Sequence, residues 1–221
     1  MNKKTLPSMV ILISGNGSNL QSIINWVQQY NVATIDAVIS NKVNALGLSR
    51  AKNANIQTEI LEMIPGQSRV EYDEDLSDII ERYQPDLIVL AGFMRILSEL
   101  FVEKYLGKLI NIHPALLPKF KGLNTHQRAI DAKQKEHGAS VHFVTPEMDE
   151  GPNIIQAKVS VLLDDCAEKL ADRVLQQEHL IYPIAIQWCL QQKIRFMDGK
   201  VFYNNQPLLQ PICYDPVIHR L

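Results

Sequence analysis

The chain has 221 residues, of which 46% are hydrophobic and 21% are charged, and its formal net charge is −2. This composition supports a sizeable core, which argues against a disordered chain, and it shows no basic stripe of the kind that nucleic-acid-binding proteins carry. The three cysteines are far apart and the first apolar run is short, so we predict a cytoplasmic protein without disulfides, zinc or membrane attachment.

The first half of the chain alternates strand-like runs with helical patterns. Leu20 and the apolar residues after it recur at the i, i+3, i+4, i+7 spacing of an amphipathic helix. Ser18-x-x-Gln21 and Ser68-x-x-Glu71 have the form of capping boxes at two helix starts. In chain order we expect a strand at 9–14, a helix at 18–30, a strand at 35–40, a short helix at 45–54, a strand at 57–62, a helix at 68–84, a strand at 86–92 and a helix at 98–106.

The second half continues this alternation and ends in a hairpin signal. His137-Gly138 is typical of a helix C-cap, and Asp198-Gly199 favours a tight hairpin turn. We expect a strand at 109–113, a helix at 124–136, strands at 140–145 and 154–161, a helix at 166–192 and a hairpin over 194–203. The alternation predicts one α/β domain over 1–221, Rossmann-like, with a mostly parallel twisted sheet, helices on both faces and a small C-terminal β-hairpin.

The first candidate site is the stretch SGNGSNL at 14–20, where a strand ends and a helix begins. Gly15 and Gly17 allow a tight turn, and the N–H groups at a helix start suit a phosphate. The stretch is neither GxGxxG nor a P-loop, because the later glycine and the Gly-Lys-Ser/Thr are missing. An ordinary strand–helix turn would read the same way, so spacing alone leaves both readings open.

The second candidate site is the end of the strand at 109–113, which places Asn111 and His113 on one face before Pro114. No second histidine or carboxylate lies at ligand spacing from His113, so we do not expect a metal. In open α/β sheets the C-terminal edge of the strands is where ligands bind. There an amide can donate to a developing oxyanion and an imidazolium can stabilise the same charge, which suits acyl-type transfer.

Two acidic residues are further candidates. Asp149 belongs to the acidic turn TPEMDEG at 145–151. This turn is either a solvated loop or a loop that places the Asp149 carboxylate beside His113, where it would orient and charge the ring. Glu178 interrupts an apolar helical stripe, so it is either paired in the core or reaching a ligand.

Several long blocks in order carry a family resemblance. The chain resembles the phosphoribosylglycinamide formyltransferases of the formyltransferase superfamily from about residue 8 to 190. The blocks are ISGNGSNL, SNK (40–42), LAGFMRIL (90–97), NIHPALLPKF, HGASVHFVTPEMDEGP (137–152), IIQAKV and QEHLIYP (177–183). The resemblance implies transfer of a formyl group from 10-formyltetrahydrofolate to the amine of N1-(5-phosphoribosyl)glycinamide in de novo purine (IMP) biosynthesis, by direct attack through a tetrahedral intermediate and without a metal. It also implies small-molecule partners only, no nucleic acid, and a monomer or homodimer.

The resemblance also implies roles for individual residues. The catalytic set would be Asn111, His113 and Asp149, with Asn111 also touching the folate. The remaining roles would be ribonucleotide binding by Gly17, Ser18, Asn19 and Glu178, folate binding by Arg69, Met94, Arg95, Ile96 and Leu97, and support from Ser140 and His142. Residues 1–105 would then form mainly the phosphate-binding half, and residues 106–221 the catalytic and folate-loop half.

The sequence departs from the family pattern at two positions. The acidic turn commonly reads Asp-Gly-Gly or Asp-x-Gly, and here Glu150 follows Asp149. The segment after the proline often carries a His-x-His pair, of which only His126 is kept because position 124 is Asn.

Three alternative functions deserve comparison. A formyltetrahydrofolate hydrolase would carry an N-terminal regulatory domain, for which we expect no room. A methionyl-tRNA formyltransferase would carry a C-terminal β domain, whereas about 30 residues follow the last long helix and the chain is not basic. A non-catalytic phosphate- or nucleotide-binding module would need only the turn at 15–19, and the set of Asn111, His113 and Asp149 argues against it.

Overall fold

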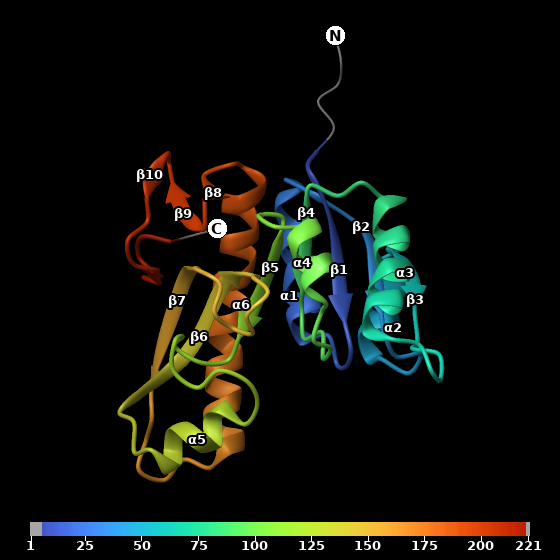
Figure 1. The fold of residues 1–221 in the computed structure, drawn as a ribbon. Coiled ribbons are helices and arrows are strands. Elements are labelled where there is room, and N and C mark those ends of the chain that lie inside the picture. Colours follow the sequence, from blue (N-terminus) through green and yellow to red (C-terminus); the bar gives the residue numbers. More distant parts are fainter. Residues whose placement is uncertain (1–5, 220–221) are drawn as a thin grey trace. The chain divides into compact units, whose positions relative to one another are not determined.

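The structure is a computed structural model that describes residues 6–219. The described residues form two compact units that divide between Ile110 and Asn111, within strand β5 (Leu109–His113). Each unit is therefore built around its own set of strands and helices (Figure 1). None of the helices between residues 6 and 219 is both long and apolar enough to cross a membrane.

The first unit is a parallel α/β arrangement, in which strands and helices alternate along the chain. Its strands lie in the order β4-β1-β2-β3, and each neighbouring pair is parallel. Met9–Ile13 are fully buried, which is why this part of the sequence reads as a continuous apolar run. The elements are β1 (Ser8–Ile13), α1 (Ser18–Tyr30), β2 (Thr34–Ser40), α2 (Leu46–Asn53), β3 (Gln57–Ile60), α3 (Arg69–Glu81), β4 (Leu87–Leu90) and α4 (Glu99–Lys104).

The second unit combines a mixed sheet with one long helix. Its strands lie in the order β11-β7-β6-β5, with β6 and β7 antiparallel and β11 parallel to β7. Helix α6 packs against β6 and β7, and strands β8 to β10 form a separate antiparallel sheet. The elements are α5 (Thr125–Asp131), β6 (Glu136–Phe143), β7 (Asn153–Ser160), α6 (Ala167–Leu190), β8 (Ile194–Met197), β9 (Lys200–Tyr203), β10 (Gln206–Pro207) and β11 (Ile212–Cys213).

The predicted class, a mostly parallel Rossmann-like α/β fold with a small C-terminal β element, is confirmed. The predicted capping box of α3 is also confirmed, because Ser68 Oγ accepts from the Glu71 N–H and the Glu71 carboxylate accepts from the Ser68 N–H. The hairpin turn is confirmed too, with Asp198 and Gly199 both in the left-handed backbone region that a type I′ turn requires.

Two local predictions were wrong. The capping box at Ser18 does not form, because Gly17 is the N-cap of α1, at φ 74°, and no side chain caps the helix. The helix at 124–136 ends at Asp131, and His137-Gly138 belongs to strand β6 instead of a helix C-cap. A Cβ on Gly138 would lie 1.9 Å from the carbonyl oxygen of Ala157, so this glycine serves the close approach of two strands.

Candidate active site

The polar end of β5 is the centre of the site. Asn111 and His113 lie on one face of the strand, and His113 is only 6% exposed. Pro114 follows at once and cannot donate a backbone hydrogen bond, so the regular ladder stops where the site begins. The strand therefore delivers an amide and an imidazole side by side at its C-terminal end.

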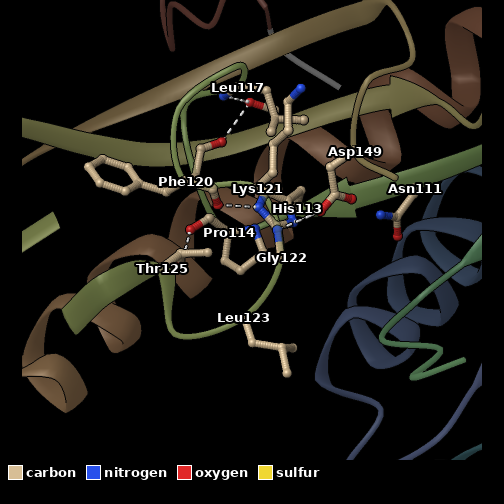
Figure 2. Close-up of polar contacts among 12 residues, drawn as sticks. Asn111, His113, Pro114, Leu117, Phe120, Lys121, Gly122, Leu123, Thr125 and Asp149 are labelled. Atoms are coloured by element: carbon tan, nitrogen blue, oxygen red, sulfur yellow. Dashed lines mark hydrogen bonds and ion pairs between the residues drawn. The ribbon is translucent and has the colours of Figure 1, made fainter. Parts of the chain in front are cut away.

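Both nitrogens of the His113 ring face oxygen atoms (Figure 2). Nε2 lies 2.9 Å from the backbone carbonyl oxygen of Phe120, which can only accept, so Nε2 carries a hydrogen. Nδ1 lies 3.4 Å from Oδ2 of Asp149, and the two side chains are 7% and 12% exposed. This arrangement suits an imidazolium paired with a carboxylate, largely shielded from solvent.

Backbone geometry places the Asp149 carboxylate. Asp149 has φ 54°, in the left-handed region that Asp and Asn tolerate better than most residues. Its Oδ2 accepts a hydrogen bond from the Gly122 N–H at 2.9 Å. Two residues further on, a Cβ on Gly151 would lie 1.8 Å from the carbonyl oxygen of Phe143, so only glycine lets the loop approach β6 this closely. The sequence prediction that Asp149 lies beside His113 is confirmed in position.

His142 orients the amide of Asn111. Burial is the main cause that lowers the pKa of His142, to about 4, against opposing effects of the Phe143 carbonyl and the Asp149 charge. Its Nδ1 donates to the Phe143 carbonyl oxygen at 2.9 Å, which leaves Nε2 to accept from Nδ2 of Asn111 at 3.3 Å. The 3.9 Å separation between His142 Nε2 and Asp149 Oδ1 is too long for a hydrogen bond, and a neutral ring makes no ion pair.

Ser140 fixes the chain just after His113. Its hydroxyl donates to the Ala115 carbonyl oxygen at 2.6 Å and accepts from the Leu117 N–H at 3.0 Å. It also accepts from Nε2 of Gln156 at 2.9 Å, and Ser140 is fully buried. Ser140 and His142 thus both contact the segments that carry the candidate catalytic groups, and their supporting role in catalysis stays a prediction.

Two further histidines lie near His113. The rings of His126 and His137 are 5.2 Å apart between centroids, and His137 also meets Phe120 edge-on. Burial, followed by the charges of neighbouring histidines, lowers the pKa of His126 and lowers that of His137 to about 4. Both rings are therefore neutral near pH 7. Asn124, the departure from the family pattern, is the N-cap of α5 at φ 57°, a conformation that asparagine tolerates.

Glu178 lies on the buried face of α6, where it is 7% exposed. Tyr182 follows one turn later on the same helix, and its pKa is raised first by burial and also by the charges of Cys189 and Glu178. Glu178 is therefore a core carboxylate by position, and its contact with a ligand stays a prediction.

In the first unit, the predicted phosphate turn is held tightly. A Cβ on Gly17 would lie 2.7 Å from Cα of Gly47, so the close approach of α2 requires glycine here. Arg50 donates from Nε to the carbonyl oxygen of Asn16 and from Nη2 to its Oδ1, at 2.9 and 2.8 Å. Ser18 begins helix α1, where backbone N–H groups of the first turn have no acceptor in the helix itself. This local geometry fits an anion.

The predicted folate segment, residues 94–97, is tied to the end of β1. The Met94 N–H donates to Oγ of Ser14 at 2.7 Å, and the Ser14 N–H donates to the Gly92 carbonyl at 3.1 Å. The side chains of Met94 and Ile96 are 67% and 58% exposed, whereas Leu97 is 8% exposed. Two apolar side chains are thus presented to solvent, and Leu97 contributes to the core.

Two arginines of the first unit belong to the predicted folate contacts. The guanidinium of Arg95 lies 3.8 Å above the Tyr72 ring, and its Nη1 and Nη2 lie 3.5 and 3.6 Å from Sδ of Met63. Arg69 is the first residue of α3 and is exposed. Arg95 is therefore held by its neighbours, and the contact of the exposed Arg69 with folate stays a prediction.

Several contributors to the site were missed by sequence reasoning. Phe120 offers a carbonyl oxygen and Gly122 an amide, and Ser14 offers a hydroxyl. The backbone groups leave no residue-type signal, because every residue carries them. Between residues 6 and 219 there is no group of three or more His, Cys, Asp or Glu side chains suited to a metal ion.

The family model, the curated relatives and the solved structures that match this chain all point to the formyl transferases. Residues 8–186 match the family model for formyl transferase. Phosphoribosylglycinamide formyltransferase of Escherichia coli (strain K12) is 48% identical over 91% of this chain and 95% of that protein. The trifunctional purine biosynthetic protein adenosine-3 of Homo sapiens is 43% identical over 84% of this chain and 18% of that protein. The structure of phosphoribosylglycinamide formyltransferase from Coxiella burnetii in complex with CHES is 45% identical, with a TM-score of 0.91 and coverage of 95% of this chain and 100% of that one.

Proposed function

The chain belongs to the phosphoribosylglycinamide formyltransferases of the formyl transferase family, and we propose that it transfers a formyl group from 10-formyltetrahydrofolate to the amine of N1-(5-phosphoribosyl)glycinamide. The products are formylglycinamide ribonucleotide and tetrahydrofolate. The observation that carries the proposal is the buried contact of His113 Nδ1 with the Asp149 carboxylate, with the oriented amide of Asn111 on the same strand face as His113.

The neutral amine attacks the formyl carbon directly, and the formyl oxygen becomes an oxyanion. Asn111 uses one amide hydrogen to contact His142, so its second N–H remains to stabilise this oxyanion. Because the neutral His142 ring fixes the amide in advance, little reorganisation is needed when the charge develops.

His113 supplies the positive charge. Its Nδ1 contact with Asp149, at 3.4 Å, is longer than an ordinary N–H···O hydrogen bond, so the Nδ1–H can be shared between the carboxylate and the oxyanion without rotation of the ring. A proton must also pass from the attacking nitrogen to the leaving folate nitrogen. We assign that transfer to a water molecule held beside Asp149 and His113.

The substrate contacts follow from local chemistry within each unit. The N–H groups at Gly17, Ser18 and Asn19 would hold the ribonucleotide phosphate, because the helix start offers donors and a positive dipole end. Glu178 would contact the sugar side of the same substrate.

The folate would contact exposed groups of the first unit. The apolar side chains of Met94 and Ile96 suit a flat heteroaromatic ring, with backbone groups of Arg95 and Leu97 at its edge. The exposed guanidinium of Arg69 suits a carboxylate tail.

The test is a formyl-transfer assay with the purified full chain, glycinamide ribonucleotide and 10-formyltetrahydrofolate. We expect folate product to form only when the ribonucleotide is present, in equal amounts with the formylated ribonucleotide. Folate release without ribonucleotide would instead identify a hydrolase, and absence of turnover together with phosphate-ligand binding would identify a binding module.

A further inference from the structure

Two loops of the second unit meet beside the candidate catalytic carboxylate. One loop, residues 114–124, follows β5, and the other, residues 144–152, joins β6 to β7. Nζ of Lys121 lies 2.7 Å from Oε1 of Glu150, and the next residue, Gly122, donates its N–H to Asp149 at 2.9 Å. Consecutive residues of one loop thus contact consecutive residues of the other (Figure 2 shows the Lys121, Gly122 and Asp149 side of this contact).

Both loops adopt backbone conformations that need external support. Phe120 and Asp149 have φ 55° and 54°, in the left-handed region that non-glycine residues populate sparsely. In the loop at 114–124, Arg128 donates from Nη1 to the carbonyl oxygen of Lys121 at 2.6 Å, and its guanidinium lies 5.5 Å from the Phe120 ring centroid. Helix α5 therefore fixes the backbone from which the Lys121 side chain extends. The ion pair of Lys121 with Glu150 then links this fixed backbone to the loop at 144–152.

We propose that Lys121 and Glu150 form a latch that positions Asp149 against His113, an inference that rests on the proposed formyl transfer. The two latch residues are the chain neighbours of Gly122 and Asp149, which contact each other directly, so we assign them as positioning residues that act through Asp149. Glu150 is the middle residue of the Asp149-Glu150-Gly151 turn, and the latch gives its carboxylate a physical role. The positive charge of Lys121 also offsets the negative charge of Glu150, which is the residue next to Asp149.

The size of the effect follows from exposure. The Lys121 and Glu150 side chains are 34% and 54% exposed, so water and salt screen the pair. Such pairs stabilise a single geometry weakly, which corresponds to a factor of about two to five in an equilibrium or a rate. Loss of the latch should therefore weaken the placement of Asp149 by that factor and leave the fold intact.

Glu150→Gln and Lys121→Gln are the test variants. Each should lower kcat about two- to fivefold with little change in KM for the ribonucleotide, and the charge-swapped double variant Lys121→Glu/Glu150→Lys should restore most of the loss. Glu136→Gln is the matched control, because it breaks a similar exposed pair with Lys158, at 3.1 Å, outside both loops. It should leave kcat unchanged.

A second measurement does not depend on activity. Hydrogen exchange at the Gly122 amide reports directly on its contact with Asp149, and it should accelerate about two- to fivefold in both single variants and not in Glu136→Gln. Unchanged exchange would overturn the latch, and faster exchange with unchanged kcat would overturn its role in positioning. If the wild-type chain transferred no formyl group, the proposed function would fail while the exchange data still reported on the latch.

Discussion

Asp149→Asn is the sharpest single perturbation of the proposed site, because it removes one charge and almost nothing else. Asparagine tolerates the left-handed backbone of position 149, and its Oδ1 can still accept from the Gly122 N–H. We therefore expect the fold to survive, with a far-UV circular dichroism melt close to that of the wild type.

The expected loss of activity can be worked from the ion pair. At an effective dielectric of about 20, unit charges 3.4 Å apart attract by about 5 kcal/mol before desolvation, which cancels part of the gain. Without the Asp149 carboxylate, the His113 ring loses its negatively charged neighbour at the point where the oxyanion develops. Loss of one such stabilising group typically lowers kcat by about 10²- to 10³-fold, or about 2.7–4 kcal/mol.

The assay is steady-state formyl transfer with both substrates varied. Asp149→Asn should lower kcat by that factor while KM for the ribonucleotide stays within about twofold of wild type. Glu147→Gln is the control, since this exposed carboxylate lies on the same loop. Turnover of the Asp149 variant within about threefold of wild type would refute the assigned role.

The remaining predictions concern catalysis, pH and packing. Asn111→Ala and His113→Ala should each lower kcat more than they weaken ribonucleotide binding, and a change mainly in KM would contradict the oxyanion assignment. His137 and His142 have pKa values of about 4 when folded, below the 6.5 of an ordinary histidine, so the unfolded chain binds more protons between about pH 6.5 and 4. The free energy of unfolding should thus fall on acidification by about 1.4 kcal/mol per pH unit per ring. Urea denaturation at pH 7 and pH 5 measures this slope, which should be smaller in His142→Gln. Gly138→Ala should lose several kcal/mol of stability, because its Cβ would collide with the Ala157 carbonyl, and a loss below about 0.5 kcal/mol would contradict that packing.

Local signals predicted helices and strands well where the relevant contact is also local. The capping box of Ser68 and Glu71 forms because both partners lie within one helical turn. The local signals failed where residues distant in the sequence determine the structure. At Gly138, for example, the need for glycine comes from Ala157 in the neighbouring strand. Gly17 overrides the Ser18 capping signal for a similar reason, namely the close approach of Gly47.

The candidate site shows the same division. The alternation along β5 was enough to put Asn111 and His113 on one face. The partnership of His113 with Asp149 spans a long stretch of sequence, and without the family resemblance it was one of several options for an acidic turn. The carbonyl of Phe120 and the amide of Gly122 carry no side-chain identity, so no sequence pattern could have selected them.

Strand β11 also bears on how the protein behaves at high concentration. It pairs with β7 at Ile155 and Gln156, and the Tyr214 N–H donates a further hydrogen bond to the Gln156 carbonyl. The hydrogen-bonding edge of β7 is therefore occupied along its most apolar part. The exposed Lys158 lies just beyond the covered part. Strand β11 and the Lys158 charge together hinder other molecules from adding a strand to β7, and such additions at open apolar edges promote aggregation. A chain truncated after residue 207 should therefore scatter more light on storage than the full chain, and equal scattering would contradict this protective role.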